Sequence, residues 1–273
     1  MSADQKTAAA FATSWNHLPA GSIYTREQFE DWLFPLTESD ICGRTVLEMG
    51  CGNGSLLVHM ADWAPTFLEG VDLGDSVRSA QHNMSRLPFT KWRITQADMT
   101  RFRSSQPYDV VYSIGVLHHL KEPKLGLDAV IANTRSGGRF HCWVYAVEGN
   151  SVVIHLVDPI RKFASKFPWW FTKYCIATPL VLPYYCYAKA VSWFKRFSLV
   201  QRLPLYEYSL WISRRNFGFF RHVAFDQLVT PQTAYLSRQV IEAWLASYGN
   251  IDKESVYITM RNGNSWKFGA KLK

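Results

Sequence analysis

The sequence predicts an α/β fold, with a mostly parallel sheet covered by helices on both faces. Two observations lead to this prediction: short apolar runs alternate with segments of helical periodicity, and a glycine-rich segment follows the first apolar run. Parallel strands need a long crossover between them, so alternating strand and helix patterns are typical of parallel sheets. The chain has 273 residues and is 48% apolar, which is enough for a full-sized core and excludes a disordered chain.

The predicted elements follow one another regularly along the chain. Residues 8–40 are expected to be helical, because Phe29, Trp32 and Leu33 recur at helical spacing after an N-cap at Thr25. The predicted strands are then Thr45–Met49, 67–71, 92–97, 109–113 and 139–147, and the predicted helices are 55–63, 76–86, 123–133 and 237–248. Two last strands, 255–260 and 265–272, flank Asn262-Gly263, a dipeptide typical of two-residue hairpin turns.

Basic and aromatic residues are concentrated in residues 151–220. This stretch holds ten Lys or Arg and two acidic residues, and the surplus of eight equals the net charge of the whole chain, +8. It also holds 18 of the 41 aromatic residues. We expect an inserted, helical, aromatic-rich subdomain after the fifth strand. Aromatic rings interleaved with Lys and Arg suit a contact with anionic lipid headgroups through residues 161–202. A cap over the active site, or a platform for single-stranded nucleic acid, would have a similar composition.

Three features of the sequence bear on where the protein is located in the cell: its cysteines, its first ten residues and its longest uncharged stretch. Five cysteines form no CxxC pair and no zinc-ligand spacing, so we expect neither a disulfide scaffold nor a bound metal. Residues 1–10 lack the apolar core of a secretory signal. The uncharged stretch 174–188 is shorter than the about 20 apolar residues of a membrane span. These features predict a cytoplasmic protein that acts at the inner face of the membrane or in the cytosol.

The glycine-rich segment 48–54 reads Glu-Met-Gly-Cys-Gly-Asn-Gly and lies where the first predicted strand turns into the first helix. Glycines let the backbone turn tightly and approach a ligand, and the N-terminus of the helix offers free N–H donors. Such a loop also suits a nicotinamide dinucleotide site or an ordinary turn. The acid at Glu48 would repel a pyrophosphate, but it would attract a ligand that carries an ammonium group and a positive sulfur.

Two further acids follow the next two predicted strands. Asp72 comes at the end of the second strand and could accept both hydroxyls of a ribose. Asp98 comes at the end of the third strand and could accept from the exocyclic amine of an adenine, with Met99 beside the ring. Each acid alone is explained equally well as a solvated side chain or a helix cap. Three acids after successive strands indicate one site, because open α/β sheets bind ligands at the carboxyl ends of their strands.

Together these motifs resemble the class I S-adenosylmethionine-dependent methyltransferases, and more narrowly the branch with the ubiquinone and menaquinone methyltransferases. The resemblance is carried by residues 46–54, 70–73, 97–99 and 108–120. It implies a Rossmann-like, seven-stranded, mostly parallel sheet with one antiparallel strand, and S-adenosylmethionine as cofactor. It also implies four parts of one domain: a helical lid (1–42), a cofactor-binding core (43–150), the inserted acceptor or membrane-facing subdomain (151–221) and a C-terminal part (222–273).

The resemblance also implies where the cofactor is bound. Glu48 and the glycine loop would hold the methionine part, Asp72 the ribose, and Asp98 with Met99 the adenine, while the backbone near Ser113 would lie under the sulfonium. Two aromatic residues of the lid would fold over the cofactor. The full set of expected cofactor contacts is Trp15, Tyr24, Glu48, Gly50, Cys51, Gly52, Asn53, Gly54, Asp72, Leu73, Asp98, Met99, Ser113 and Ile114.

Methyl transfer needs a base only when the acceptor is protonated, and five residues are candidates for such a role: His118, His119, Tyr145, His222 and Asp226. In the resembling branch the residue at the position of His118 faces the acceptor, and that of His119 is more often structural. The alternative interpretation is that both histidines support their loop, that the tyrosine packs in the core, and that the aspartate anchors a turn.

The leading hypothesis is a methyltransferase that acts on a small, apolar or lipid-linked acceptor. The alternatives are an RNA methyltransferase that uses the basic insertion, and a cofactor-binding scaffold without activity. Amine-directed nucleic-acid methyltransferases carry an (Asp/Asn/Ser)-Pro-Pro-aromatic motif after the fourth strand, where this chain has Ser-Ile-Gly-Val at 113–116. That difference disfavours base methylation. The motifs leave oxygen, nitrogen, sulfur and carbon open as the accepting atom.

Overall fold

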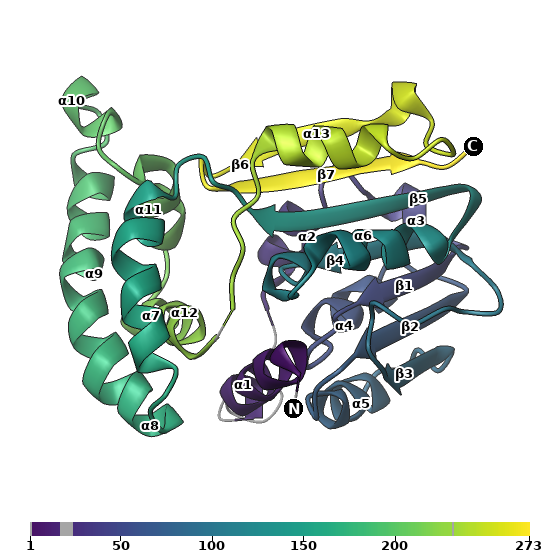
Figure 1. Ribbon diagram of the computed structural model, residues 1–273, viewed down its shortest axis with the longest axis horizontal. Helices are drawn as coiled ribbons and strands as arrows, with labels where there is room; N and C mark the ends of the chain where they lie inside the picture. Colours follow the sequence, from purple (N-terminus) through teal and green to yellow (C-terminus); the bar gives the residue numbers. More distant parts are fainter. Residues whose placement is uncertain (1, 17–23, 231) are drawn as a thin grey trace.

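The computed structural model describes residues 2–16, 24–230 and 232–273, with the backbone alone for residues 3 and 13–16. Its centre is a seven-stranded sheet with the strand order β3-β2-β1-β4-β5-β7-β6 (Figure 1). The strands are β1 (Thr45–Met49), β2 (Phe67–Asp72), β3 (Trp92–Gln96), β4 (Tyr108–Ile114), β5 (Thr134–Tyr145), β6 (Tyr257–Arg261) and β7 (Ser265–Lys271). The first five strands pair in parallel, and β7 is antiparallel to both β5 and β6.

Helices cover both faces of the sheet, and each face has its own apolar core. On one face, residues of α6 (Pro123–Ala132) and α13 (Arg238–Ala246) pack on the strands. On the other face lie α2 (Arg26–Leu33), α4 (Ser55–Ala61) and α5 (Val77–Ser85), with α3 (Glu38–Ile41) at the edge of this layer. The predicted Rossmann-like fold is therefore confirmed.

The predicted elements agree with the structure except at their ends. β1 has the predicted bounds, whereas β5 begins five residues before the predicted start, at Thr134. The predicted helical region 8–40 is divided into α1 (Ala3–Asn16), α2 and α3, and Thr25 caps α2 by accepting a hydrogen bond from the N–H of Gln28. At the hairpin, Asn262 and Gly263 have φ of 50° and 64°, the left-handed conformation of a two-residue turn.

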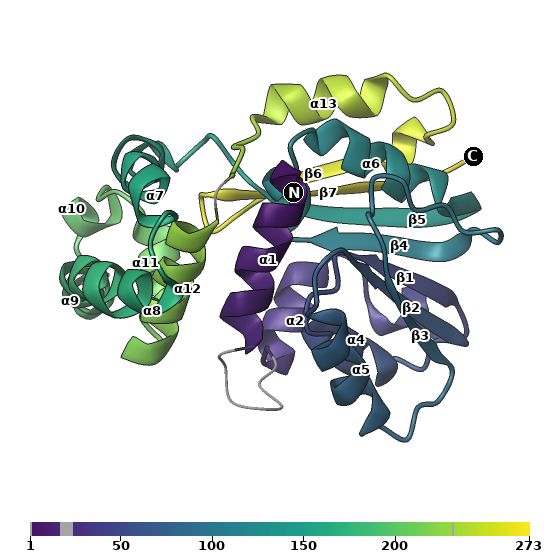
Figure 2. The ribbon, with the colours of Figure 1, turned by 60° about the horizontal axis from the view of Figure 1, so that its bottom comes forward.

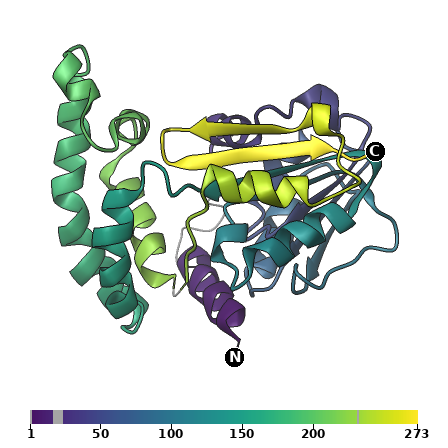
Figure 3. The same cartoon turned by 45° about the horizontal axis from the view of Figure 1, so that its top comes forward.

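The inserted residues form a helical subdomain beside the carboxyl ends of the parallel strands (Figures 1 and 3). Its helices are α7 (Asp158–Ala164), α8 (Trp169–Phe171), α9 (Thr178–Trp193), α10 (Ser198–Gln201), α11 (Tyr206–Ile212) and α12 (Phe217–Val229). A π-helical turn, Thr172–Ala177, joins α8 to α9. The expected boundary after residue 221 lies inside α12, because Asn216 caps this helix and its buried Phe220, Phe225 and Leu228 all pack within the subdomain. The subdomain therefore extends to Val229.

The N-terminal helix α1 lies between this subdomain and the sheet (Figure 2). Asp4, in its first turn, accepts a hydrogen bond of 2.7 Å from the backbone N–H of Lys121, which follows β4. Across the described ranges, no helix is both long enough and apolar enough to cross a membrane.

Candidate functional site

A cavity of about 700 Å³ lies at the carboxyl ends of β1, β2 and β4, between the sheet, α1 and the inserted subdomain. Three of its walls come from segments far apart in the sequence. The loop after β1 provides Gly50, Cys51, Gly52 and Asn53, and α1 provides Thr7, Ala8 and Phe11. Residues of α9, α11 and α12 provide the wall opposite the sheet. This position matches the general rule for ligand sites in open α/β sheets.

The loop between β1 and α4 depends on its glycines. Gly50, Gly52 and Gly54 all have positive φ, between 52° and 85°, a region in which side chains are disfavoured. A Cβ atom on Gly50 would overlap the side chain of Val116. Gly54 precedes the first residue of α4, so the N-terminus of this helix faces the same side of the sheet. The backbone of the loop can therefore approach a ligand closely, as the sequence predicts.

Glu48 is the last but one residue of β1 and lines the cavity while being almost completely buried. Its Oε2 accepts a hydrogen bond of 3.1 Å from the hydroxyl of Tyr112 on the neighbouring strand. Burial raises the pKa of Glu48 to about 8, an effect that the Tyr112 hydrogen bond only partly opposes. A carboxylate in such a place has the capacity to pair with a cationic group that enters the cavity.

Asp72 and Asp98 line the same cavity, so the three acids that follow successive strands do meet. Asp72 accepts backbone hydrogen bonds from Gly52 (2.9 Å) and Gly74 (2.8 Å), which fix the carboxylate against the glycine loop. Burial raises the pKa of Asp72, while these two donors oppose the rise. Asp98 accepts from the backbone N–H of Thr100 at 2.9 Å. Each acid keeps acceptor capacity beyond these contacts, because a carboxylate has about four lone-pair sites.

The expected catalytic residues divide into four that line the cavity and one that does not. His119, Tyr145, His222 and Asp226 belong to the lining, whereas the described lining does not include His118. Nε2 of His222 lies 3.2 Å from Oδ2 of Asp226, one turn further along α12. The interpretation of Asp226 as the anchor of a turn is therefore wrong, because the residue lies inside a helix.

The two neighbouring histidines have different surroundings. His118 is fully buried against the ring of Tyr145, with 4.0 Å between centroids, and neither of its ring nitrogens has a hydrogen-bond partner among the described residues. Burial holds the pKa of His118 well below its usual value. Nδ1 of His119 lies 3.1 Å from the carbonyl oxygen of Gln232, so Nδ1 is the protonated nitrogen and Nε2 is free to accept. Burial lowers the pKa of His119 to about 3.

The remaining predicted residues occupy different parts of the site. Tyr24, Leu73, Met99 and Ile114 line the cavity, and the Tyr145 hydroxyl accepts a hydrogen bond of 2.8 Å from Nε2 of Gln227. Ser113 is instead fully buried, and its hydroxyl donates to the carbonyl of Met49 at 2.8 Å between β4 and β1. Trp15 lies on α1, but its side chain is outside the described residues. No group of His, Cys, Asp and Glu able to hold a metal occurs in the described part of the chain.

Comparison with known proteins decides the family. Residues 21–203, about two thirds of the chain, match the model of a family described as a methyltransferase domain. This chain belongs to the methyltransferase domain family. The predicted class, the class I S-adenosylmethionine-dependent methyltransferases, is confirmed, and S-adenosylmethionine is the cofactor.

Individual relatives of this methyltransferase are distant. The tRNA U34 carboxymethyltransferase of Idiomarina loihiensis is 26% identical over 136 residues, which are 48% of this chain and 42% of that protein. The same enzyme of Pseudoalteromonas translucida is 28% identical over 144 residues, 52% of this chain and 43% of that protein. The methyltransferase thus spans less than half of these relatives.

The fold of the methyltransferase also occurs in a solved structure. Magnesium protoporphyrin IX methyltransferase of Synechocystis PCC 6803, crystallised with S-adenosyl-L-homocysteine, superposes with a TM-score of 0.54 at 12% identity. The match covers 99% of this chain and 98% of that one, so the likeness includes the inserted region. At this identity the likeness concerns the fold alone.

The part of the cavity beside the inserted subdomain is lined largely by apolar side chains, and we call it the apolar compartment. The sequence predicted only that this subdomain is rich in aromatic residues. Apolar and aromatic residues of the inserted subdomain in this compartment include Val153, Leu156, Leu180, Val181, Tyr184, Tyr208, Trp211, Phe219, Phe220 and Val223, and α12 adds the polar His222, Asp226 and Gln227. Sequence reasoning missed Phe11 of α1 and Arg261 of β6, which also line the cavity. Arg261 gave no signal in the sequence, because it stands directly before the Asn-Gly turn and reads as a turn-flanking surface residue.

Proposed function

We propose that this methyltransferase transfers a methyl group from S-adenosylmethionine to a small, apolar or lipid-linked acceptor. One observation carries the proposal: a single cavity has three carboxylates and a glycine loop at one end, and an apolar wall from the inserted subdomain at the other. The apolar body of an acceptor would gain from burial against this wall, whereas a polar or charged group of the acceptor would need a hydrogen-bond or charge partner of its own there.

The residues at the sheet end of the cavity fit the cofactor. Glu48 would pair with the ammonium group of the methionine part, and its buried, weakly hydrogen-bonded carboxylate suits that role. Asp72 would accept from the ribose, and Asp98 with Met99 would contact the adenine. When bound, the cofactor supplies a methyl group on a positive sulfur. The protein then has to hold the acceptor in line with that methyl group and exclude water, which together can lower the barrier by several kcal/mol.

A protonated acceptor would need a base, and α12 carries the best-placed pair. Nε2 of His222 and Oδ2 of Asp226 lie 3.2 Å apart, and both residues line the cavity that the glycine loop also lines. In such a pair, the carboxylate orients the imidazole and stabilises it after it takes a proton. Nε2 of His119 is a second acceptor for a hydrogen bond, although its strongly lowered pKa makes this imidazole a weak base. We therefore assign the proton transfer to His222.

The outer face of the inserted subdomain supports a lipid environment for the acceptor. Along the helical run 169–193, Trp170 and Trp193 are 52% and 85% exposed, and Tyr174 and Leu182 are exposed between them. The two lysines of this run point inward instead: Lys173 is only 9% exposed, and Nζ of Lys189 donates to the carbonyl of Ser213 at 2.5 Å. A helix with its charges inside and its apolar residues outside is the reverse of the usual arrangement at a surface exposed to water.

Basic residues stand at both ends of this apolar face. Lys162 and Lys166 lie before it, and Lys195, Arg196 and Arg202 lie after it, all of them exposed. An apolar face between two basic ends matches an anionic lipid surface, into which the rings insert while the cations contact the headgroups. We propose that the methyltransferase takes its acceptor from the inner face of the membrane through this surface.

An RNA acceptor is the second candidate function. Two observations favour an RNA acceptor: the relatives of this chain include tRNA U34 carboxymethyltransferases, and the chain has a net charge of +8. The apolar outer face and the apolar compartment count against it, because RNA is bound through its phosphates and stacked bases.

The test is the transfer of label from methyl-labelled S-adenosylmethionine to a cell extract that has been separated into lipid, small-molecule and RNA fractions. Label in the lipid fraction is the expected result. Label in the RNA fraction alone would overturn the lipid proposal in favour of the second candidate. Transfer to no fraction, by a protein that binds the cofactor, would indicate the scaffold. A variant with Asp72→Ala is the matched negative control, since it should bind no cofactor.

A further inference from the structure

Arg261 is a buried cation at the acceptor end of the cavity. The residue ends β6, is 6% exposed and belongs to the lining of the cavity. Its guanidinium lies among three tryptophan rings, 6.0 Å from the centroid of Trp32, 5.9 Å from that of Trp143 and 5.0 Å from that of Trp211. These rings come from α2, β5 and α11, so Arg261 stands where the lid, the sheet and the inserted subdomain meet.

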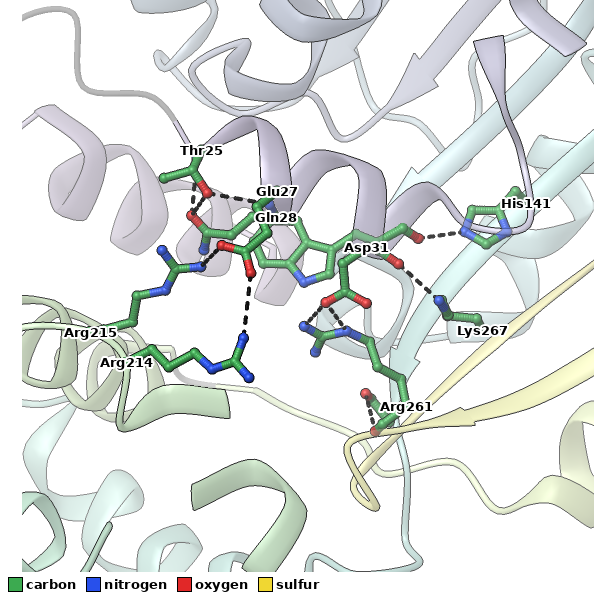
Figure 4. A network of polar contacts seen from close by, with 11 residues as sticks. Thr25, Glu27, Gln28, Asp31, His141, Arg214, Arg215, Arg261 and Lys267 are labelled. Carbon is green, nitrogen blue, oxygen red and sulfur yellow. Dashed lines mark hydrogen bonds and ion pairs between the residues drawn. The ribbon is translucent and has the colours of Figure 1, made fainter. Parts of the chain in front are cut away.

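The hydrogen bonds of Arg261 leave part of the guanidinium unused. Both Nε and Nη2 donate to Oδ2 of Asp31, the former at 2.8 Å, as Figure 4 shows. Within the described chain Nη1 has no hydrogen-bond partner. A guanidinium has five N–H donors, and Nη1, which is accessible and not fully enclosed by protein, carries two of them. The two N–H groups of Nη1 are therefore available to an oxygen atom in the cavity.

A second cation gives this cluster a surplus of positive charge. Nζ of Lys267, a buried side chain on β7, donates to the backbone carbonyl of Asp31 at 2.8 Å (Figure 4). Arg261, Lys267 and Asp31 together carry two positive charges and one negative charge. This surplus favours the approach of an anion.

Tyr208 adds a second donor on the same side of the cavity. Its ring stacks on Trp211 with 5.6 Å between centroids, next to Arg261, and the residue lines the cavity. Its hydroxyl makes no hydrogen bond with any of the described residues. Burial raises the pKa of Tyr208 well above its usual value, and the charge of Arg261 opposes this rise, as expected for neighbouring groups. The phenol therefore stays protonated and can donate.

We infer that Arg261 and Tyr208 form a subsite for an anionic oxygen group, a carboxylate or a phosphate, on the methyl acceptor. The inference rests on the proposed function, and it narrows the acceptor to an amphiphile with an apolar body and one anionic group. The ring of Trp143 lies 5.9 Å from the guanidinium of Arg261 and also lies beside Gly115, the residue that follows β4. Trp143 is thus a neighbour of both the subsite and the loop after β4.

Three probes of equal chain length test the subsite: octanoate, octyl phosphate and octanol. Each is titrated by calorimetry into the full-length protein saturated with S-adenosyl-L-homocysteine. We expect at least one of the two anions to bind about tenfold more tightly than octanol, because a charged acceptor forms stronger hydrogen bonds with a guanidinium. A preference for octanoate identifies a carboxylate on the acceptor, and a preference for octyl phosphate identifies a phosphate.

Variants assign this preference to the two residues. R261Q should abolish it, R261K should keep part of it, and Y208F should reduce it about threefold, while octanol binds each variant as it binds the wild type. R214Q is the matched control, because Arg214 is an exposed arginine of the inserted subdomain that pairs with Glu27 at 3.9 Å (Figure 4). R214Q should keep the full preference.

Several outcomes would overturn the subsite. Octanol and both anions binding equally to the wild type would do so while leaving the apolar compartment, and thus the proposed function, intact. An anion preference that persists in both R261Q and Y208F would show that Arg261 is only a structural link between α2, β6 and α11. If R261Q does not fold, Y208F decides, and an unchanged preference counts against the subsite. If no probe binds, the subsite and the apolar compartment are both overturned.

Discussion

Glu48 and the His222–Asp226 pair are the individual residues on which the proposed chemistry depends. Burial raises the pKa of Glu48 to about 8. Glu48 is therefore largely protonated near neutral pH in the protein without ligand. An ammonium group beside it favours the charged form, so binding of the cofactor and ionisation of Glu48 are linked.

The linkage at Glu48 gives the first prediction. At pH 7, binding of S-adenosylmethionine should release close to one proton, and the affinity should rise by up to about tenfold per pH unit until the pH reaches about 8. E48Q should bind more weakly, without proton release and without this pH dependence. Calorimetry in buffers of different ionisation enthalpy measures the released proton. Equal proton release by the wild type and E48Q would rule out Glu48 as the partner of the ammonium group.

The second prediction concerns the acid–base pair on α12. H222Q and D226N should each lower the turnover number by about 10²-fold, and the double variant should be no slower than H222Q, because the two side chains act as one unit. The affinity for S-adenosyl-L-homocysteine should stay unchanged. Single-turnover rates with the labelled acceptor provide the measurement, and additive losses in the double variant would contradict a shared role.

At the scale of single elements, the connection from β1 to α4 has the strictest backbone requirements. Gly50 combines a φ of 85° with a Cβ position already occupied by Val116, so two separate costs would arise from any side chain there. Gly43, before β1, has a similar φ of 72° but no atom within 4 Å of its Cβ position. A side chain at Gly43 would therefore cause backbone strain alone, whereas a side chain at Gly50 would cause both backbone strain and steric overlap.

This contrast gives the third prediction. Gly43→Ala should lower the free energy of unfolding by about 1 kcal/mol, the cost of a left-handed conformation alone, and leave cofactor binding unchanged. Gly50→Ala should cost more than that and should weaken binding of S-adenosyl-L-homocysteine at least tenfold, since the loop must shift away from Val116. Urea unfolding and calorimetry measure the two effects. Equal losses of stability and equal affinities in both variants would show that the overlap has no consequence.

The whole molecule consists of a cofactor-binding sheet with a helical subdomain on one side (Figure 1). Residues of both parts line the cavity. The outer face of the subdomain exposes Trp170 and Trp193. Its exposed tryptophans would be costly in water and favourable in a lipid headgroup region.

The fourth prediction therefore concerns vesicles. The protein should float with vesicles that contain phosphatidylglycerol, less so with pure phosphatidylcholine, and less so again at high salt. The double variant W170S/W193S should lower the bound fraction about tenfold. Leu125→Ser is the matched control, because Leu125 is an exposed apolar residue of α6, on the sheet side of the molecule. Equal loss in the control, or no loss in the double variant, would count against the proposed surface.

The sequence alone was enough to predict the sheet, the glycine loop and the three acids around it. These features depend on short segments, because neighbouring residues determine the pattern of a strand, a turn and the start of a helix. In addition, the carboxyl ends of parallel strands meet at one edge of the sheet. The sequence was therefore enough to predict that Asp72 and Asp98 line one site. The hairpin at Asn262-Gly263 was predictable for the same local reason.

Only the tertiary structure decided which way the side chains of the inserted subdomain and of β6 face. Lys173 and Lys189 belong to the basic residues of 161–202 that the sequence predicts to contact lipid headgroups, yet they point inward. Arg261 stands beside a turn in the sequence, yet it lines the cavity. His222 and Asp226 became a pair because α12 continues through them. Each of these outcomes depends on contacts between segments far apart in the chain, and local periodicity carries no information about such contacts.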